Sequence, residues 1–595
     1  LIKFYRRRAR RILPALFFTM LICIPFARSW LLPSHLNDFN ESLISISIFS
    51  SNILFWRESG YFGIESELKP LLHTWSLSVE EQFYLFFPLL LIFITKLKKN
   101  IILIILAALG LTSFITSVWG SYNAPSATFY LLPTRIWELF IGVIIAIQVY
   151  RNNINSKMLY KNNRSTCEIL GAIGLLLICY ATFCFDKETP FPSHYALIPT
   201  IGTAFIILFS SKHTFTGKLL SSKPLVFIGL ISYSAYLWHQ PIFVFYRHKK
   251  LLTPGTHELL FLSILTLIFA YLSFRYIETP FRRTRSLSGN NIFVISLISS
   301  LFFLTIGLIG LYATAPQIVV NKKGVNLVEL EKKIEINYGQ SKDCDELNGD
   351  MAKCSPHSNP EVLLCGDSYA MHLYDGIVAS NPEIKITQLT KDFCGQILGI
   401  APTNKTHKNK WANECLEFNN NVIKYIENND SIKYIVLSSK LEQYLNNVFD
   451  PETGQVEHID ENQIENKISS TMSKIESLGI ETVFISPPPN NDTNIGQCLI
   501  KADFWDKNKN LCDFSTDDLS NNYLRTENIL QNISNKHNIA FLKNGMCFKG
   551  RCLTSVNEVY LYRDFGHLTR EGSKFIGERM DFYKIISEKS ITRTN

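Results

Sequence analysis

The sequence predicts two parts of different fold class, a multi-span α-helical membrane bundle followed by an α/β domain built as a three-layer sandwich. Residues 1–316 hold repeated apolar runs of about 17 to 23 residues, the length needed to cross roughly 30 Å of hydrocarbon. Residues 317–595 hold no such run, and short apolar strand patterns alternate there with helical ones. We therefore divide the chain into a membrane domain (1–285), a linking transmembrane helix (286–316), a linker (317–360) and a domain outside the membrane (361–595).

Ten apolar segments in the first part are candidate crossings, at residues 12–32, 40–57, 83–97, 100–119, 129–150, 167–184, 194–210, 223–247, 257–276 and 291–315. Basic runs at 6–11, 96–100, 150–157 and 281–285 border several of them, and the positive-inside rule places such runs in the cytoplasm. The segment 40–57 is short and rich in Ser and Asn, so we interpret it as interfacial or re-entrant. Nine crossings then leave the C-terminal domain outside the cytoplasm.

The formal net charge of the chain is +8, and the basic residues gather beside apolar segments. This distribution indicates contact with a lipid bilayer and does not indicate a nucleic-acid groove. The chain begins at Leu1, and its first residues lack the short apolar core and the small-residue cleavage site of a signal peptide. We therefore expect the sequence to be truncated at its N-terminus.

The cysteines divide by region. Cys23, Cys167, Cys179 and Cys184 are scattered in or beside apolar segments, where a cysteine is usually a small buried apolar residue. Nine more follow in the second part, and eight of them form neighbouring couples, Cys344/Cys354, Cys394/Cys415, Cys498/Cys512 and Cys547/Cys552. Because the C-x-x-C spacing of metal sites is absent, the couples favour disulfides in an oxidising compartment over a metal site. Cys365 stands alone in a strand pattern and is expected to be free.

Three clusters of polar residues fall at membrane depth, where polar side chains are costly and are candidates for function. The first holds His73, Trp75, Ser76, Glu80, Glu81 and Gln82, the second Arg135 and Glu138, and the third Ser232, Tyr233, Tyr236 and His239. Arg135 and Glu138 are three residues apart and can pair on one helical face. The alternative is that Arg135 and Glu138 form only an ion pair within their helix, and that His73 and His239 are side chains at the membrane interface with their hydrogen bonds satisfied. Three clusters in one bundle favour a lined cavity.

Five motifs in the first part, "FYRRRARRILPAL", "HTWSLSVEEQFYLFFP", "TRIWELFIG", "ISYSAYLWHQP" and "IETPFRR", occur in this order. Together they resemble the acyltransferase family 3 membrane enzymes over essentially all of residues 1–285. The resemblance implies transfer of an acyl group, usually acetyl, from cytoplasmic acetyl-CoA to hydroxyls of a glycan outside. It implies no bound cofactor, with acyl-CoA, a surface glycan and the bilayer as partners.

The resemblance also assigns a donor site to an Arg-x-x-Arg pattern at the cytoplasmic face, which Arg7, Arg8, Arg10 and Arg11 match. Guanidinium groups suit the phosphates of coenzyme A, although a positive-inside anchor is an alternative reading of the same residues. The family's first helix carries a histidine thought to be essential, and the sequence holds no counterpart upstream of Leu1. The histidine of the membrane step therefore has no residue number here.

In the second part, a strand pattern at 361–365 leads through Gly366 and Asp367 to Ser368 at the start of a helical pattern. A serine at such a junction exposes its hydroxyl near backbone N–H groups that can hold a developing oxyanion. Near the C-terminus, Asp564 precedes His567 by three residues, so one loop can supply a base and the carboxylate that orients it. The alternatives are a common turn at Ser368 and a solvated helix cap at Asp564.

The order of these motifs resembles the SGNH hydrolase family over about 361–580, and SGNH domains are known behind family 3 acyltransferases. Apolar patterns at 432–440 and 480–489 supply two inner strands of the expected SGNH-hydrolase-like sandwich. The family implies a glycine and an asparagine as oxyanion donors. Gly395 or Gly399 could be the glycine, but "KLEQY" after Ser439 offers no asparagine. Loss of one donor costs about 10² to 10³ in rate, which would suit a transferase better than a hydrolase.

These observations predict an O-acyltransferase of the bacterial cytoplasmic membrane, with Ser368, Asp564 and His567 in the extracytoplasmic or periplasmic domain. The acceptor would be a surface polysaccharide such as O-antigen, lipopolysaccharide or a similar glycan. A membrane-anchored carbohydrate esterase is the first alternative, although one helix would suffice as its anchor. A non-enzymatic transporter or scaffold is the second.

Overall fold

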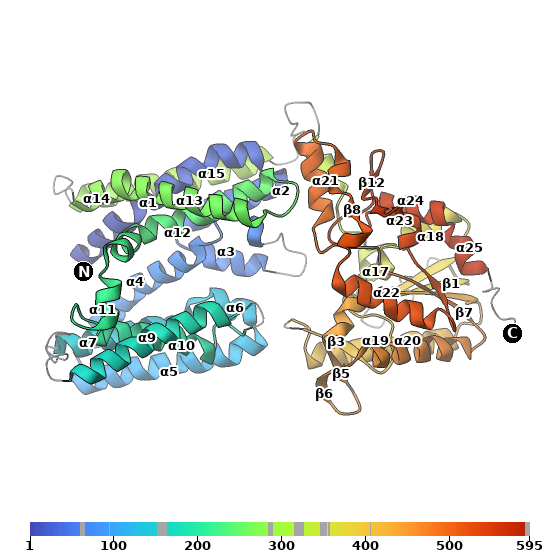
Figure 1. Cartoon of the computed structure of the whole chain (residues 1–595), viewed down its shortest axis with the longest axis horizontal. Coiled ribbons are helices and arrows are strands. Elements are labelled where there is room, and N and C mark those ends of the chain that lie inside the picture. The colour runs from blue at the N-terminus through green and yellow to red at the C-terminus, as the bar shows by residue number, and fades with distance from the viewer. Residues whose placement is uncertain are drawn as a thin grey trace. The chain divides into compact units, whose positions relative to one another are not determined.

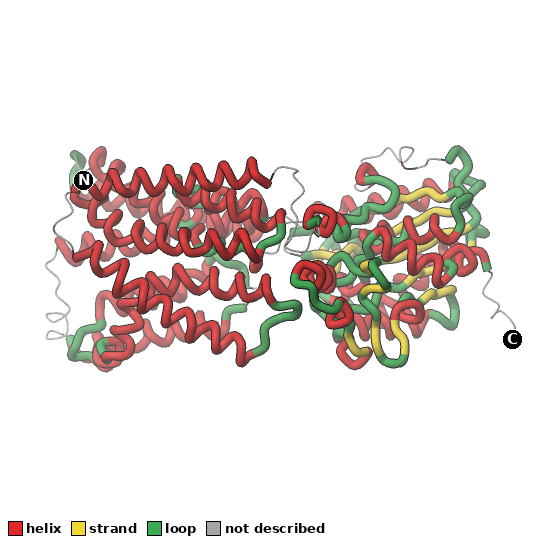
Figure 2. Tube along the Cα trace, turned by 90° about the horizontal axis from the view of Figure 1, so that it is seen from above, coloured by secondary structure: helices red, strands yellow, loops and turns green. Residues whose placement is uncertain are grey.

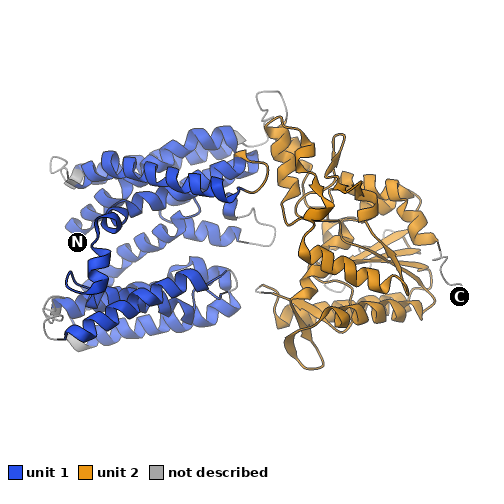
Figure 3. Cartoon of the chain, viewed as in Figure 1, with its two compact units in different colours: residues 1–248, 254–317 blue, residues 249–253, 318–595 orange. Residues whose placement is uncertain are grey.

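The computed structural model describes residues 1–59, 66–94, 96–151, 163–186, 189–283, 289–314, 326–344, 354, 357–404 and 406–588. The chain divides into two compact units, drawn in separate colours in Figure 3. Unit 1 comprises residues 1–248 and 254–317, and unit 2 comprises residues 249–253 and 318–595. The described part of unit 1 is helical, whereas unit 2 mixes helices with strands (Figure 2).

Unit 1 is a helix bundle (Figure 1). Its elements are α1 (Ile2–Trp30), α2 (Pro33–Ser47), α3 (Ser51–Glu58), α4 (Thr74–Ile94), α5 (Lys99–Asn123), α6 (Pro125–Tyr130), α7 (Ile136–Arg151), α9 (Arg164–Cys184), α10 (Leu197–Phe209), α11 (Phe215–Leu220), α12 (Lys223–Lys249), α13 (Thr256–Ser273), α14 (Thr279–Arg283) and α15 (Gly289–Thr314), with a π-helical turn at Phe274–Glu278.

Six helices in the described residues are long and apolar enough to cross a membrane, at Ile2–Trp30, Thr74–Ile94, Ile101–Asn123, Arg164–Cys184, Thr256–Arg282 and Asn291–Tyr312. Two more apolar helices, Ile136–Tyr150 and His194–Phe209, are shorter. Helix α12 is long enough to cross, but its tyrosines, serines and His239 lower its mean hydropathy, and it is not among these six. The bundle is therefore a multi-span one, and six of the nine expected crossings meet these requirements of length and hydropathy.

The segment 40–57 does not form one continuous helix. Helix α2 ends at Ser47, Phe49 takes a left-handed conformation with φ of 53°, and α3 begins at Ser51. Two short helices cannot each span the hydrocarbon layer, which agrees with our reading of 40–57 as a segment that does not cross. Of the predicted basic runs, residues 152–157 and 284–285 lie outside the described residues, and residues 281–283 end helix α14.

Helices α9 and α10 pack closely because two glycines face each other. A Cβ on Gly174 would lie 2.7 Å from the carbonyl oxygen of Gly202, and a Cβ on Gly202 would lie 2.8 Å from that of Gly174. Small residues allow the backbones of two membrane helices to come into contact. Because the hydrophobic effect does not drive helices together within lipid, van der Waals contacts between them stabilise the pair.

Unit 2 is built on a five-stranded parallel sheet in the order β2-β1-β4-β7-β9. The strands are β1 (Val362–Gly366), β2 (Ile386–Thr390), β4 (Tyr434–Ser438), β7 (Glu481–Ile485) and β9 (Asn538–Ala540). The predicted strands at 361–365, 432–440 and 480–489 are β1, β4 and β7. Strand β7 stops before Pro487 because proline cannot donate to a ladder.

Helices cover both faces of this sheet and complete the three layers (Figure 1). Helices α19 (Asn409–Glu427), α20 (Glu461–Glu476) and α22 (Asn521–Ile533) share one buried cluster with Leu363, Cys365 and Leu437 of the sheet. Helices α18 (Tyr374–Ser380), α24 (Arg570–Met580) and α25 (Phe582–Ser587) pack together, and α25 contacts β4 and β7. The prediction of an α/β three-layer domain is confirmed.

The remaining elements of unit 2 are short. They are α16 (Leu327–Lys332), α17 (Ser368–Met371), α21 (Ile495–Phe504), α23 (Lys543–Met546), β3 (Ala401–Thr403), β5 (Asn447–Asp450), β6 (Gln455–His458), β8 (Phe514–Ser515), β10 (Cys547–Phe548), β11 (Arg551–Cys552), β12 (Ser555–Val556) and β13 (Val559–Tyr560). Disulfides join Cys344 to Cys354, Cys394 to Cys415, Cys498 to Cys512 and Cys547 to Cys552, while Cys365 is buried and free.

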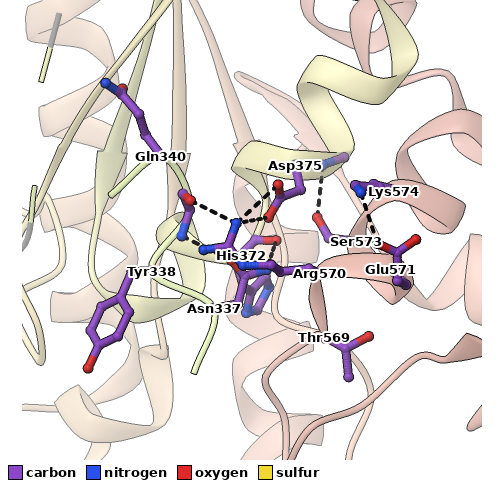
Figure 4. A network of polar contacts seen from close by, with 12 residues as sticks. Asn337, Tyr338, Gln340, His372, Asp375, Thr569, Arg570, Glu571, Ser573 and Lys574 are labelled. Carbon is purple, nitrogen blue, oxygen red and sulfur yellow. Dashed lines mark hydrogen bonds and ion pairs between the residues drawn. The ribbon is translucent and has the colours of Figure 1, made fainter. Parts of the chain in front are cut away.

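The segment predicted as a linker over 317–360 is folded against unit 2 where the structure describes it. Leu327 and Leu330 of α16 are buried. The Gln340 N–H donates to the Gln388 side chain at 3.0 Å, and Arg570 donates to the Gly339 carbonyl at 3.1 Å (Figure 4). Residues 326–344 of the predicted linker therefore belong to unit 2, because they bury apolar side chains and hydrogen-bond to α24 and β2.

Candidate active site

Ser368 lies at the carboxyl edge of the parallel sheet, directly after β1. Gly366 ends β1 with a φ of 141°, and a Cβ there would lie 1.9 Å from the Ser438 carbonyl oxygen. Only glycine fits such a turn. The side chain of Asp367 then caps α17 by accepting the Tyr369 N–H at 2.9 Å. The cap places Ser368 in the first turn of a helix, as the strand–turn–helix pattern predicts.

The loop before α24 holds the other two predicted catalytic side chains. Asp564 Oδ1 accepts the N–H groups of Gly566 at 3.0 Å and of His567 at 2.9 Å, which closes a tight turn. The His567 carbonyl accepts the Arg563 N–H at 2.9 Å, and Thr569 caps α24. These local bonds fix the imidazole relative to its carboxylate.

The structure brings Ser368, His567 and Asp564 together in one hydrogen-bonded line. His567 Nε2 lies 2.9 Å from Ser368 Oγ, and His567 Nδ1 lies 2.9 Å from Asp564 Oδ2. A proton on Nδ1 satisfies the carboxylate and leaves Nε2 free to accept the serine proton. The arrangement can therefore activate Ser368 as a nucleophile.

The carboxylate of this line is held in its charged form. Burial would raise the pKa of Asp564, but the charge and hydrogen bond of His567 and the guanidinium of Arg563 hold it well below its ordinary range. Arg563 Nη2 lies 3.2 Å from Asp564 Oδ2. An ionised carboxylate stabilises the imidazolium that forms when His567 takes the serine proton.

Asp367 organises a second polar network that the sequence did not reveal. Its Oδ2 accepts hydrogen bonds from Ser439 Oγ at 2.7 Å, from Lys440 N at 2.9 Å and from Gln443 Nε2 at 2.9 Å. The side chain is fully buried, and burial raises the pKa of Asp367 although these donors oppose it. The only feature of the sequence that could have indicated this network is the aspartate in the turn before Ser368. Its hydrogen-bond partners lie just after β4, far away in the chain.

The two glycines proposed as oxyanion donors lie in different surroundings. A Cβ on Gly395 would lie 2.4 Å from Ser439 Oγ, so Gly395 adjoins the Asp367 network. Gly399 instead lies beside Lys467 of α20, 3.1 Å from its amine by the same measure. In the described part of the chain, no hydrogen bond uses the Gly395 N–H. Of the two candidates, Gly395 is therefore the one that adjoins the Asp367 network and has an N–H without an acceptor among the described residues. Lys440 follows Ser439, where the family pattern has an asparagine, and its N–H donates to Asp367.

His372 is a second buried histidine beside the first, and the sequence analysis did not single it out. Its ring centroid lies 5.9 Å from that of His567, and Leu568 N donates to its Nδ1 at 3.4 Å. Burial, and then the charge of His567, hold the pKa of His372 well below its ordinary value. Asn337 donates to the His372 carbonyl at 3.4 Å, which ties residue 337 to this region (Figure 4).

The predicted donor-site arginines line α1. The guanidinium of Arg8 lies 3.7 Å from the centre of the Tyr84 ring of α4. Glu80 interacts electrostatically with Arg8 and Arg11, and Glu81 with Arg8. Arg7 is exposed, and Arg10 is half-buried. The structure thus brings Arg8 and Arg11 of α1 and the two glutamates of α4 into one charged cluster.

His73 and His239, which belong to the first and the third of the predicted polar clusters, lie together in the bundle. Their ring centroids are 5.3 Å apart. The Tyr236 hydroxyl donates to the His73 carbonyl and lies 3.0 Å from Ser76 Oγ. Neither ring nitrogen of the buried His73 has a hydrogen-bond partner among the described residues.

Arg135 and Glu138 form an ion pair of 3.0 Å, as their spacing predicts. The Arg135 guanidinium lies among the rings of Trp75, Phe129 and Phe191, at 5.3, 5.0 and 5.1 Å from their centres. Glu138 borders a cavity of about 320 Å³ between α7 and α10 that is otherwise mostly apolar. His73 and His239 do not line this cavity. It is therefore not the cavity, lined by all three polar clusters, that the sequence predicts.

Comparisons with known proteins match both units. Residues 1–275 match the family described as an acyltransferase domain, and residues 338–582 match the SGNH domain fused to AT3 domains. The peptidoglycan O-acetyltransferase OatA of Listeria monocytogenes is 31% identical over 47% of this chain and 46% of its own length. The O-acetyltransferase OatA of Staphylococcus aureus is 30% identical over 48% of each chain.

The chain thus spans about half the length of these two relatives. Among solved structures, the periplasmic domain of a lipopolysaccharide acetyltransferase from Salmonella serovar Paratyphi A aligns with a TM-score of 0.34 and 19% identity. That alignment covers 46% of this chain and 99% of the solved one.

Proposed function

The chain belongs to the acyltransferase family in which an SGNH domain is fused to the membrane domain, and from this premise we propose that it is an O-acetyltransferase acting on a cell-envelope glycan. The observation that carries the proposal is the position of His567 between Ser368 and Asp564, at 2.9 Å from each. The named relatives are O-acetyltransferases, which supports the same reaction class for this chain.

In the first half-reaction, Ser368 Oγ attacks the carbonyl carbon of an acetyl donor. His567 Nε2 takes the hydroxyl proton, and the negative charge on the carbonyl oxygen is met by backbone donors such as the Gly395 N–H. The carbon–leaving-group bond then breaks, and His567 returns the proton to the leaving group. The product is an acetyl ester on Ser368.

In the second half-reaction, a glycan hydroxyl attacks that ester. His567 takes the proton of the hydroxyl, the Ser368–acetyl bond breaks, and the proton returns to Ser368 Oγ. Water could attack in place of the glycan. An oxyanion site without the usual asparagine slows both attacks, so the transferase depends on binding its acceptor close to Ser368.

We place acetyl-CoA, the first acetyl donor, on the cytoplasmic side, because the arginines of α1 supply the guanidinium groups that suit its phosphates. Unit 1 takes the acetyl group from acetyl-CoA and passes it across the membrane, where the acetylated group of unit 1 is the donor that Ser368 attacks. The cytoplasmic membrane of a bacterium, with unit 2 on the extracytoplasmic or periplasmic side, is supported by the four disulfides of unit 2, since disulfides persist in oxidising compartments. The acceptor class is a surface glycan; peptidoglycan, which the Listeria relative is named for, and lipopolysaccharide are the two to compare.

The test is to express the full chain, its Ser368→Ala variant and a matched Ser470→Ala control in a host whose envelope lacks O-acetylation. Ser470 is exposed and only donates to a backbone carbonyl of its own helix. Acetate released from purified peptidoglycan and from lipopolysaccharide by mild alkali is measured by mass spectrometry. Acetate is expected on one glycan with wild type and control and not with Ser368→Ala.

Equal acetylation by the Ser368→Ala variant would exclude the SGNH serine from the reaction. In a host that already acetylates its glycans, loss of acetyl groups on expression of the wild type would instead identify an esterase.

A further inference from the structure

Three aromatic rings form a compact cluster on unit 2, and nothing in the proposed chemistry uses them. The rings of Phe393 and His407 stack with centroids 4.4 Å apart and planes at 16°. Trp411 of α19 completes the cluster, 4.5 Å from His407 and 5.5 Å from Phe393. All three side chains are half-buried, so each keeps some accessible ring surface. We call Phe393, His407 and Trp411 the aromatic platform.

The aromatic platform lies next to the catalytic turn. Phe393 follows β2, whose last residue Thr390 pairs with Gly366 of the turn, and the Lys391 N–H donates to the Gly366 carbonyl at 3.1 Å. Gly395, the proposed oxyanion donor, is two residues after Phe393, so their Cα atoms are at most about 7.6 Å apart. Ligands of open parallel sheets bind beyond the carboxyl ends of the strands, and this is that edge.

The loop that carries Phe393 is fixed in place on α19. Cys394 is bonded to Cys415 of that helix, and Asn419 Nδ2 donates to the carbonyls of Gly395 at 2.9 Å and Ile397 at 3.2 Å. The same helix carries Trp411. One clamp therefore sets the position of both a platform ring and the oxyanion glycine.

Phe393 has an unfavourable backbone that packing alone does not explain. Its φ of 57° is in the left-handed region, which a bulky residue rarely adopts. The core cluster beneath α19 includes Trp411 at its margin but not Phe393. A ring held half-exposed in a strained conformation beside a catalytic turn is a candidate for ligand contact.

We propose that the aromatic platform binds a sugar ring of the acceptor, adjacent to the sugar whose hydroxyl is acetylated. The C–H bonds on the flat face of a pyranose carry partial positive charge and contact the negative face of an aromatic ring. Phe393 is two residues from Gly395, which adjoins Ser439 and the Asp367 network next to Ser368. The platform therefore suits a neighbouring ring and not the reacting one. This inference rests on the proposed function, because it names the subsite by which that function holds its glycan.

The platform makes the enzyme select oligosaccharides over single sugars. A monosaccharide can fill only the reacting position, whereas an oligosaccharide also stacks on Phe393 and Trp411. The contribution is to acceptor binding, so it changes the KM for oligosaccharide and leaves the formation of the acetyl-serine unchanged.

The test uses the full chain in detergent with p-nitrophenyl acetate as donor. The acceptors are oligosaccharides of about five sugars, and the corresponding monosaccharides, from the de-O-acetylated glycan that the wild type acetylates in cells. The variant Phe393→Leu keeps an apolar side chain and removes the flat ring, and Phe393→Tyr keeps the ring. The matched control is Phe504→Leu, in a half-buried ring pair with Trp505 at 4.7 Å elsewhere in unit 2.

Phe393→Leu is expected to raise the KM for the oligosaccharide about tenfold while ester hydrolysis without acceptor and monosaccharide transfer stay at the wild-type rate. Phe393→Tyr and Phe504→Leu should behave as wild type. An unchanged oligosaccharide KM in Phe393→Leu would overturn the platform, as would an equal fall in hydrolysis and transfer, which indicates a structural role. If wild type and Ser368→Ala release p-nitrophenol equally, the proposed function itself fails, a result that is separate from both.

Discussion

The hydroxyl of Ser439 donates a hydrogen bond of 2.7 Å to Oδ2 of Asp367, the residue immediately before the proposed nucleophile Ser368. This contact joins the end of β4 to the turn after β1, and Lys440 and Gln443 add two donors to the same oxygen. A buried carboxylate with this many donors holds the strand ends in register. The position of Ser368 therefore depends on a side chain that takes no part in the chemistry.

Replacing Asp367 tests that dependence. Asp367→Ala leaves the Ser439, Lys440 and Gln443 donors buried without an acceptor, and each orphaned group costs about 1 to 3 kcal/mol. We expect unit 2 to lose about 3 kcal/mol of stability or more, read out as faster hydrogen exchange in peptides of β1 and β4 in the full chain. Asp430→Ala, at an exposed aspartate, is the control, and equal protection in both variants would contradict the assignment.

His372 predicts a pH dependence of stability. Its folded-state pKa lies well below the ordinary value, so the unfolded chain binds a proton below about pH 6.5 that the folded chain does not. Stability is therefore full above that pH and falls as the pH decreases toward the folded pKa. Each pH unit in that window costs up to about 1.4 kcal/mol, or about 2 kcal/mol between pH 6.5 and pH 5.

The measurement is urea-dependent proteolysis of unit 2 in the full chain at pH 7 and pH 5. The variant His372→Gln should show a smaller loss between the two values than the wild type. The exposed His458→Gln should keep the wild-type loss. A His372→Gln variant that loses as much as the wild type would mean that another group sets the acid sensitivity.

The Cys394–Cys415 disulfide is expected to be the more costly of two disulfides to remove. It closes a separation of 21 residues, whereas Cys547–Cys552 closes 5. Loop-closure entropy gives about 3 kcal/mol for the longer loop and about 2 kcal/mol for the shorter one. The double alanine variants of each pair, compared by urea-dependent proteolysis, should preserve this order; the reverse order would show that the chain-entropy account does not apply.

The sequence predicted the architecture well where periodicity and local motifs determine it. The strand–turn–helix at Ser368 and the Asp564–His567 loop are local patterns, so their residues could be named before their contact was known. The Asp367 network was not predictable, because Ser439 and Gln443 reach it through the pairing of β4 with β1, more than 70 residues away. The pairing of β4 with β1 joins segments that are distant in the chain, so no local motif marks these partners.

The same reason explains the other differences. His372 and Phe393 acquire their neighbours from segments distant in the chain, so neither stood out among many histidines and phenylalanines. The segment 317–360 was predicted to be a linker, and within its described residues Leu327 and Leu330 are buried. In the membrane part, the interpretation of 40–57 as a segment that does not cross followed from its length and its Ser and Asn content, whereas the close packing of Gly174 on Gly202 required the structure.

The nucleophile and its base are 199 residues apart in the chain. At about 5 to 20 residues per second, Ser368 leaves the ribosome roughly 10 to 40 s before His567 does. For that interval the nascent chain carries a serine with an ordinary, unreactive hydroxyl. The hydrogen bond that can activate Ser368 therefore forms only after the loop before α24 has been synthesised.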